Sequence, residues 1–319
     1  MLNDDGPPSP QSCPYLLPFV EALQNAGHLV SVVIPDSSRS WIGKAHLIGV
    51  QVKATYVSPS LFQTHGSGEH DTQNDDAHDG KNDWVVVSGT PACCTQLGLY
   101  SLFPDREPID LVVSGPNHGR NATTIYSLAS GTVGGAMEAV TCGKKAIAVS
   151  FASKEDQPAE VIQAASRLSA RLIEHLYTHW PESVELFNIN VPMYPDVEHR
   201  PIVYSTTLQG YWSKGSLYGE VDVAIDQNNN HADQAPTESG GEGKRTRYFQ
   251  WAPELSDIQR MVDASEPGTD AFTISQGCTS DANSHSPTPQ WGDDSQTNSV
   301  TPLTANYNHV PGFSGELQI

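Results

Sequence analysis

The sequence predicts an α/β fold built on a parallel sheet that helices cover on both faces. From Tyr15 to about Ser205, short β-branched runs alternate with helical patterns, which is typical of parallel strands joined by helical crossovers. The runs are hydrophobic almost throughout, as expected of strands that are buried on both faces. The predicted strands are Leu29 to Ile34, Trp84 to Ser88, Ile109 to Ser114, Lys145 to Phe151 and Glu185 to Val191.

Helical patterns occupy the segments between these strands. A first helix is indicated by apolar residues at the spacing of one helix face, with Gly27 following where a left-handed C-cap belongs: Leu16, Phe19, Val20 and Leu23. A second helix is predicted to begin at Thr90-Pro91, a capping residue followed by proline. Two more are expected from Ser130 toward Cys142 and from Pro158 to His179.

The start of the chain is unusual for such a fold. The polar turn from Asn3 to Gly6 should follow a buried strand, but only Met1 and Leu2 precede it. We therefore expect the first, central strand to be truncated. A missed first exon in the gene model would produce this.

Composition narrows the classes of function. The 319 residues include 17 Lys plus Arg and 37 Asp plus Glu, for a formal net charge of −20, which disfavours binding to nucleic acid polymers and anionic membranes. The apolar runs stop far short of the ~20 residues that span a bilayer, and no signal peptide is visible, so a cytoplasmic location is expected. The five cysteines lack CxxC spacing and are read as reduced thiols.

The predicted organisation is an α/β domain over residues 1–205 and a C-terminal appendage over residues 206–319. Three polar insertions, at residues 65–83, 226–247 and 280–298, are too poor in apolar residues to bury surface and are expected to be solvated loops. The last of them also resembles an unremoved intron. Residues 257–264 are expected to be helical, and residues 300–307 to resume ordered structure.

Asn3-Asp4-Asp5-Gly6 is the first motif that could carry chemistry. A turn at Gly6 can bring the two carboxylates toward one point, where their like charges require a cation. Hard oxygen ligands select Mg²⁺ or Mn²⁺. The alternative is an ordinary surface turn, for which the same residues are well suited.

A second motif, Arg39-Ser40, follows the strand that ends at Ile34. Loops at the carboxyl ends of parallel strands form the ligand crevice of an open sheet, where a hydroxyl suits a metal and a guanidinium suits a phosphate. A helix cap beside a solvent-facing arginine explains these residues equally well.

The third motif, Ser114-Gly115-Pro116-Asn117-His118-Gly119-Arg120-Asn121, directly follows a strand. Asn117 offers an amide oxygen to a cation, Arg120 offers a fork that matches phosphate, and Gly115 lets the backbone approach a ligand. His118 is either a general acid or a simple loop residue.

A fourth motif, Ser130-Gly131-Thr132, opens a helix whose free N–H groups can bind an anion, although these small residues also allow close helix packing. The chain has no GxGxxG after a strand and no P-loop, which disfavours dinucleotide and P-loop binding.

In this order and spacing, the four motifs resemble the SurE survival-protein family of metal-dependent phosphatases and nucleotidases. Trp41-Ile42-Gly43 and Gly89-Thr90-Pro91-Ala92 make the chain most similar to the fungal branch, described as acid phosphatases. The resemblance implies a doubly wound, mostly parallel, Rossmann-like sheet with a smaller C-terminal β-rich arm, and a homodimer or higher homo-oligomer. It implies that Asp4, Asp5 and Asn117 are catalytic and that the metal ligands are Asp4, Asp5, Ser40 and Asn117. The phosphate- or substrate-binding residues would be Asn3, Arg39, Ser114, Gly115, Arg120, Asn121, Ser130, Gly131 and Thr132.

The function expected from these motifs is metal-dependent hydrolysis of nucleoside monophosphates or other small phosphomonoesters, as a 5′/3′-nucleotidase or acid phosphatase using Mg²⁺ or Mn²⁺. One alternative is a catalytically impaired nucleotide- or phosphate-binding protein, or a truncated gene model of the same family. A sugar-transferring enzyme on a similar scaffold is a further alternative, disfavoured because the chain offers only one domain of that type.

Overall fold

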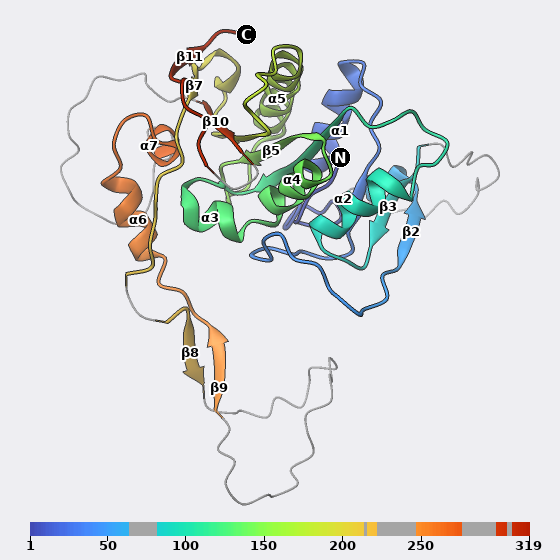
Figure 1. Ribbon diagram of the computed structural model, residues 1–319, viewed down its shortest axis with the longest axis horizontal. Coiled ribbons are helices and arrows are strands. Elements are labelled where there is room, and N and C mark those ends of the chain that lie inside the picture. Colours follow the sequence, from blue (N-terminus) through green and yellow to red (C-terminus); the bar gives the residue numbers. More distant parts are fainter. Residues whose placement is uncertain (64–81, 214–215, 222–246, 276–297, 305–307) are drawn as a thin grey trace, which may run out of the picture. The chain divides into compact units, whose positions relative to one another are not determined.

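The computed structural model describes residues 1–63, 82–213, 216–221, 247–275, 298–304 and 308–319 (Figure 1). The three polar insertions therefore lie, apart from their last residues, outside the described residues. The helices are α1 (Leu16–Asn25), α2 (Pro91–Tyr100), α3 (Thr123–Ala129), α4 (Gly131–Thr141), α5 (Ala159–Thr178), α6 (Ser256–Asp263) and α7 (Asp270–Ser275). The strands are β1 (Val33–Pro35), β2 (Ala54–Val57), β3 (Trp84–Val87), β4 (Leu111–His118), β5 (Lys145–Phe151), β6 (Leu186–Val191), β7 (Ile202–Tyr204), β8 (Tyr218–Val221), β9 (Tyr248–Trp251), β10 (Asn298–Leu303) and β11 (Gly315–Leu317).

The central sheet consists of two parts that the first residues of the chain join. One part has the strand order β11-β7-β10-β6-β5-β4 and the other β1-β3-β2. The Leu2 N–H donates to Val113 of β4 (3.0 Å), and the Val33 N–H of β1 donates to the Met1 carbonyl (2.9 Å). Met1 and Leu2 thus occupy the position between β4 and β1. Leu2 forms a single parallel bridge there, with Ser114.

The strands next to the site are mostly parallel. β4 pairs with β5, β5 with β6, and β1 with β3, all in parallel, while β10 pairs antiparallel with β6. Parallel neighbours place their carboxyl ends at one edge of the sheet, which is the edge where an open α/β sheet binds ligands.

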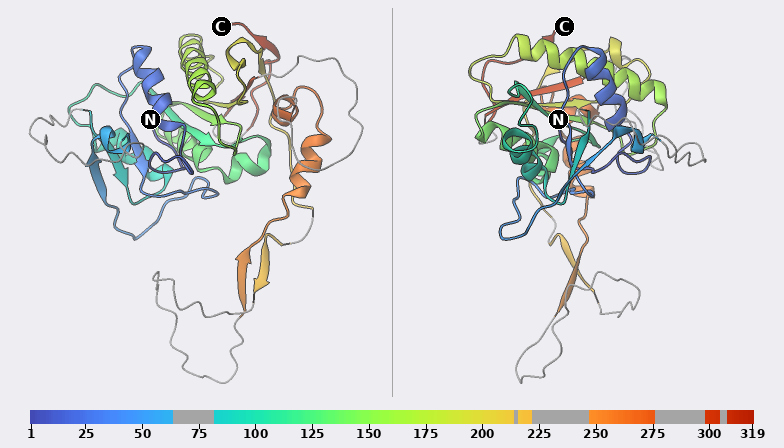
Figure 2. Two further views of the ribbon diagram at one scale, coloured as in Figure 1. Left: turned by 180° about the vertical axis from the view of Figure 1, so that it is seen from behind. Right: turned by 90° about the vertical axis from the view of Figure 1, so that its right-hand side faces the viewer.

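Helices cover both faces of this sheet (Figures 1 and 2). On one face, α1 and α5 pack apolar side chains such as Phe19 and Leu172 against Ile147 and Phe187. On the other face, α2 and α4 pack around Val112 and Ala148. The fold is therefore doubly wound, as expected.

The predicted helices and strands are found, with differences at their ends. β5 spans the predicted residues, and α1, α2, α4 and α5 lie where their patterns placed them. β1 is shorter than expected, and Leu29, its predicted first residue, is 97% exposed. The elements that were not predicted include β2, a largely exposed edge strand, and α3, whose N-cap residue makes no capping hydrogen bond. Strands β7, β8, β9 and β11 and helix α7 were not predicted either.

The described chain divides into two compact units, residues 1–210 with 265–319, and residues 211–264. The second unit contains the β8–β9 hairpin, in which Tyr218 pairs with Trp251, and helix α6. This hairpin is the smaller β arm. α7, β10 and β11, which follow residue 205 in the sequence, belong to the first unit. The domain boundary at residue 205 stays a prediction. No helix among the described residues is both long and apolar enough to cross a membrane.

Candidate functional site

A small cleft opens at the carboxyl ends of the parallel strands. Its walls come from the turn after residue 3, the loop after β1, the end of β4 with α3, the start of α4 and the loop after β5. It is lined by Asp4, Ser40, Trp41, Asn117, Arg120, Asn121, Tyr126, Ala129, Ser130 and Lys154. Six of these are residues that the sequence predicted: Asp4, Ser40, Asn117, Arg120, Asn121 and Ser130.

Asp4 and Asp5 are adjacent in the sequence, and both are buried, with 2% and 5% of their surfaces exposed. Asp4 accepts a hydrogen bond from the Thr132 hydroxyl, and Asp5 accepts one from the His118 N–H at 2.7 Å. Burial raises the pKa of Asp4, and burial together with repulsion from Asp4 raises the pKa of Asp5 to about 8. Two carboxylates in this setting favour a bound positive charge.

The turn that carries the aspartates is shaped by Asn3 and Gly6. The Asn3 amide donates to the Gly6 carbonyl (2.8 Å) and accepts from the Gly6 N–H (3.3 Å). Gly6 has φ +89°, and a Cβ there would lie 2.9 Å from the Ser37 carbonyl carbon, so glycine is required. Asn3 thus positions the turn, and its predicted contact with phosphate stays a prediction.

The start of helix α4 approaches Asp4 closely. Ser130 caps the helix by accepting the Val133 N–H at 3.1 Å. A Cβ at Gly131 would lie only 2.7 Å from the Asp4 Cβ, so only glycine lets the helix begin here. The first N–H groups of a helix lack partners within it. Here the Thr132 N–H group binds the Asp4 carboxylate, which ties that carboxylate to the start of the helix.

The end of β4 turns the backbone into the cleft through Gly115. Its φ is +124°, and a Cβ there would lie 2.1 Å from the Val149 carbonyl oxygen. Beyond it, the Asn117 Nδ2 group donates a hydrogen bond to the Gly119 carbonyl oxygen at 2.6 Å. The amide Oδ1 is therefore the Asn117 atom that suits a cation.

Asn121 is fixed by partners from the neighbouring strands. Its Nδ2 donates to the Ser150 hydroxyl (2.9 Å), its N–H donates to Asn190 (2.8 Å), and its carbonyl accepts from Asn188 (2.8 Å). The backbone of Asn121 is thus fixed on both sides by β6, and its side chain is fixed by one hydrogen bond to β5.

The backbone just after Asn121 is anchored by Asp270 of α7. The fully buried Asp270 carboxylate accepts the N–H groups of Thr123 (3.0 Å), Leu208 (2.9 Å) and Ala271 (2.7 Å). Thr123 has φ +74°, which is rare for a β-branched residue and is held here by this contact. Burial raises the pKa of Asp270 to about 6, although the three donors oppose the shift.

Seven predicted residues lie outside the cleft lining: Asn3, Asp5, Arg39, Ser114, Gly115, Gly131 and Thr132. Arg39 binds the Asp36 carboxylate (2.9 Å) and the Gly89 carbonyl (3.2 Å). Ser114 is fully buried within β4, and Thr132 donates its hydroxyl to Asp4. The phosphate-binding roles of Arg39 and Ser114 therefore stay predictions.

His118 also lies outside the lining. Its ring packs edge-on against Tyr15, with the ring centroids 5.2 Å apart. Burial lowers the pKa of the ring, and the nearby Lys154 adds to the effect. In this structure the residue acts on the site through its N–H group, which binds Asp5.

Sequence reasoning missed Lys154, Trp41 and Tyr126. Lys154 follows β5, and a Cβ at Gly119 would lie 2.6 Å from the Lys154 Cε, so the lysine side chain runs directly over that glycine. Its position after a parallel strand was the signal that could have found it. Trp41 stands beside Ser40 in the sequence, but Tyr126 reaches the cleft only through α3, which was not predicted.

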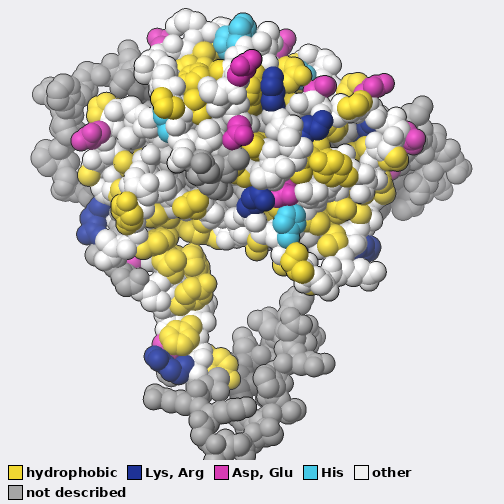
Figure 3. All heavy atoms as spheres, viewed as in Figure 1, with side chains coloured by type: hydrophobic (Ala, Val, Ile, Leu, Met, Phe, Trp, Pro, Cys, Tyr) yellow, Lys and Arg dark blue, Asp and Glu magenta, His cyan; other side chains and the backbone are white. Residues whose placement is uncertain are grey.

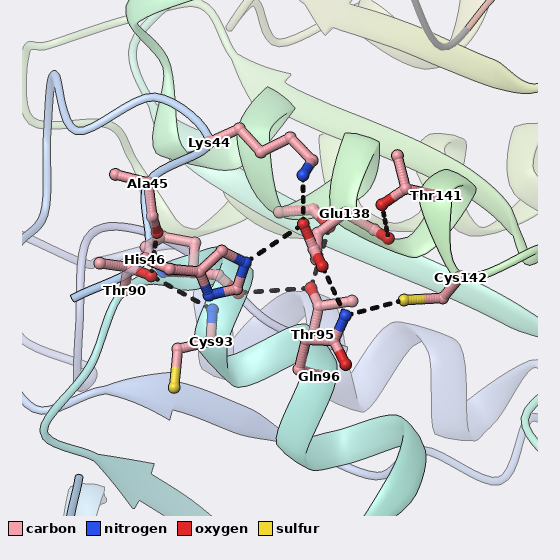
Figure 4. A network of polar contacts seen from close by, with 12 residues as sticks. Lys44, Ala45, His46, Thr90, Cys93, Thr95, Gln96, Glu138, Thr141 and Cys142 are labelled. Atoms are coloured by element: carbon pink, nitrogen blue, oxygen red, sulfur yellow. Dashed lines mark hydrogen bonds and ion pairs between the residues drawn. The ribbon is translucent and has the colours of Figure 1, made fainter. Parts of the chain in front are cut away.

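Glu138 of α4 contacts the loop that carries Ser40 (Figure 4). Glu138 is 4% exposed; it pairs with Lys44 and with His46 (3.3 Å), and accepts a hydrogen bond from Gln96. Burial raises the pKa of Glu138, but its hydrogen bonds from Gln96, Lys44 and His46 outweigh this and hold it below its usual range. The loop is thereby fixed to both α2 and α4.

The family profile of the survival protein SurE matches residues 1–214. The chain belongs to the SurE family. A 5′-nucleotidase SurE from Rhodopirellula baltica is 34% identical over 194 residues, which are 60% of this chain and 64% of that protein. A SurE protein from Aquifex aeolicus has a similar fold in its crystal structure, with a TM-score of 0.57, 22% identity, and coverage of 95% of this chain and 92% of that one.

A yeast relative supports the fungal branch of the SurE family. The probable tubulin–tyrosine ligase PBY1 of Saccharomyces cerevisiae is 30% identical over 342 residues, covering all of this chain. This chain spans only 42% of the yeast protein and less than two thirds of the Rhodopirellula SurE protein.

Proposed function

We propose that this chain is a metal-dependent phosphomonoesterase that hydrolyses nucleoside monophosphates or other small phosphomonoesters, as a nucleotidase or acid phosphatase. The observation that carries the proposal is a cleft lined by the buried carboxylate of Asp4 and by the cations of Arg120 and Lys154, with the buried carboxylate of Asp5 next to Asp4 in the sequence. The names of the bacterial relatives agree with this chemistry.

The donors at the cleft fit a hard divalent cation. Among the described residues no group of three or more His, Cys, Asp and Glu side chains is placed to hold a metal, so the Ser40 hydroxyl and the Asn117 amide oxygen would complete the set with Asp4 and Asp5. An all-oxygen set suits Mg²⁺ or Mn²⁺. The raised pKa of both aspartates supports this assignment, because a cation would relieve the repulsion between them. When bound, the ion would lower the pKa of a coordinated water and offset negative charge on the phosphoryl group.

The chain's own residues would bind and orient the phosphate. Arg120 and Lys154 bring positive charge to the cleft, and Ser130, the N-cap residue of α4, also lines it. In hydrolysis, a water oxygen forms a bond to phosphorus while the bond to the ester oxygen breaks, and the ester oxygen takes up a proton. The charge on the phosphoryl oxygens then lies among these donors, which stabilises the transition state.

A small substrate agrees better with the charge of the molecule than a polyanion does. The chain carries a formal net charge of −20, and on the face shown in Figure 3 the Lys and Arg side chains lie as separate spots among acidic and apolar ones. A nucleic acid polymer gains most of its affinity from a continuous basic track. We also propose that the protein is cytoplasmic, that it forms a homo-oligomer and that a domain boundary lies at residue 205.

The test is phosphate release from p-nitrophenyl phosphate and a panel of nucleoside monophosphates, with Mn²⁺ or Mg²⁺ and with EDTA. We expect metal-dependent release that Asp5→Asn lowers by more than about a hundredfold, since it removes one of the two carboxylates. The control Asp110→Asn removes the same charge just before β4, at the opposite end of that strand from the cleft. Release that survives EDTA refutes the metal assignment, and a folded protein that binds phosphate but releases none supports the alternative of an impaired binding protein.

A further inference from the structure

We propose that Asp270 is a positioning residue for phosphate binding: its carboxylate holds the first residue of α3 and thereby sets how Asn121 and Ser130 face the cleft. The inference rests on the proposed function, because it concerns the cleft in which the phosphomonoester would be hydrolysed. Asp270 lies beyond residue 214, where the match to the SurE family profile ends. It does not line the cleft, so it acts through the backbone of α3 and not on a ligand.

Helix α3 connects two residues that line the cleft. Asn121 precedes the helix by two residues, and Ser130 directly follows its last residue, Ala129. Ser130 is also the N-cap residue of α4, where the Thr132 hydroxyl binds Asp4. Because α3 has only seven residues, a displacement of its first residue is transmitted to both of its neighbours in the cleft. The position of α3 thus decides the geometry of one wall of the site.

The sequence of α3 does not by itself fix where the helix begins. Its N-cap residue, Ala122, has no side-chain oxygen that could accept a backbone N–H group. Thr123 has φ +74°, which is strained for a β-branched residue. The hydroxyl of Thr123 is buried and has no hydrogen-bond partner among the described residues, so it does not hold this conformation. The conformation must therefore be held by a contact from outside the helix.

Asp270 supplies that contact. Its Oδ2 accepts the Thr123 N–H at 3.0 Å, while its Oδ1 accepts the Leu208 N–H at 2.9 Å. The N–H group of Asp270 in turn donates to the Thr206 carbonyl at 2.8 Å. The aspartate is thus fixed to the segment that follows β7 and holds the start of α3 against it.

The next residue of α3 is bound to the same segment. The Thr124 N–H donates to the Leu208 carbonyl at 2.9 Å, and the Thr124 hydroxyl accepts the Gly210 N–H at 2.8 Å. Residues 206–210 therefore hold the second residue of α3 directly, but the strained first residue depends on Asp270.

The carboxylate is kept at this position despite the cost of burying it. Asp270 is fully buried, and burial raises its pKa to about 6. A buried carboxylate is tolerated when its oxygens accept hydrogen bonds, and here the donors include backbone N–H groups of Thr123 and Leu208, which are far apart in the sequence. The charge thus joins separate segments next to the site.

A simpler interpretation is that Asp270 only stabilises the fold. The two interpretations differ in a measurable way. A purely stabilising residue changes the free energy of unfolding but leaves the KM of the folded protein unchanged. A positioning residue changes KM, and its effect depends on the conformation of Thr123.

The experiment measures kcat and KM for p-nitrophenyl phosphate with Mn²⁺ at pH 7.5, above the pKa of about 6, so that the Asp270 carboxylate is ionised. We expect Asp270→Asn to lower kcat/KM by about tenfold to a hundredfold, mainly through a higher KM, since a shift of about 1 Å in a positioned group has effects of this size. Thr123→Gly should recover severalfold of this loss in the Asp270→Asn background, because glycine adopts φ +74° without strain. In the wild-type background it should change kcat/KM little.

Leu172→Ala is the matched control for lost stability. Leu172 is fully buried in α5 and does not line the cleft, so its truncation should destabilise the fold while leaving KM unchanged. If Asp270→Asn shows no cooperative unfolding in urea, Asp270→Glu takes its place with the same expectations, because it keeps the charge and moves the carboxylate by one methylene group.

The outcomes separate this inference from the proposed function. A folded Asp270→Asn protein with wild-type kcat and KM overturns the positioning role and leaves the phosphomonoesterase intact. A loss that Thr123→Gly fails to reduce, or an equal rise in KM in Leu172→Ala, overturns it as well. If the wild-type chain releases no phosphate, the proposed function fails, and calorimetric binding of inorganic phosphate to the same variants decides. Weaker binding by Asp270→Asn that Thr123→Gly partly restores then supports the positioning role, and equal or absent binding overturns it.

Discussion

The buried carboxylate of Asp270 should make the stability of this protein depend on pH in a predictable direction. Its pKa is 3.8 in an unfolded chain and about 6 in the fold, because burial disfavours the charge. The folded state therefore binds a proton more tightly than the unfolded state does. The resulting stability is fully present below pH 4 and is lost as the pH rises through about 6.

The magnitude follows from the size of the shift. A rise of about 2 pKa units corresponds to about 3 kcal/mol, and roughly half of this is lost between pH 5 and pH 7. Asp270→Asn cannot titrate, so it lacks this slope. It also replaces one accepting oxygen by an NH₂ group that faces a backbone N–H, which should cost about 1–3 kcal/mol at every pH.

The assay is urea unfolding of the wild type and of Asp270→Asn at pH 5, 6 and 7 in EDTA. Asp4 and Asp5 titrate in both proteins, so their contribution cancels in the difference. We expect the advantage of the wild type to shrink by roughly 1.4 kcal/mol from pH 5 to pH 7. The exposed Asp105→Asn serves as the control for loss of one charge. A difference between wild type and Asp270→Asn that stays constant with pH would refute the reasoning.

Three further predictions concern the site and the core. Gly131→Ala should lower phosphate release by at least about tenfold, because its Cβ would lie 2.7 Å from the Asp4 Cβ and displace that carboxylate; thermal unfolding checks that the fold persists. Glu138→Ala should cost about 2 kcal/mol in urea unfolding by leaving its lysine partner unpaired, and a cost below about 0.5 kcal/mol would contradict its anchoring role. Leu172→Ala, fully buried in α5, should cost about 2–5 kcal/mol, whereas Leu128→Ala, 56% exposed, should stay within about 0.5 kcal/mol.

Sequence reasoning succeeded where a short pattern decides the local structure. The apolar face of α1, the Thr90 cap of α2 and the long stripe of α5 each predicted a helix that the structure contains. Reasoning failed for α3 and β2, because α3 begins at a strained threonine without a capping hydrogen bond and β2 is an exposed edge strand. Neither has an apolar periodicity that could be read in isolation.

Some residues of the candidate site could likewise be predicted from the sequence, and others could not. Asp4, Asn117 and Ser130 were predicted because each directly follows a strand or opens a helix, and the sheet gathers such positions at one edge. Tyr126 and Asp270 were missed because their roles depend on contacts across about 85 to 150 residues of sequence. No local spacing carries that information.

The sequence by itself determined the α/β class, the order of the central elements and the polar residues that end its strands, because periodicity and turn chemistry act over a few neighbouring residues. Only the tertiary structure decided how those residues are used. It placed Met1 and Leu2 in the central strand position, committed Arg39 to Asp36, and brought Trp41 and Tyr126 together in the cleft. These outcomes depend on which distant groups share a space once the core is packed, and burial then sets their charges and partners.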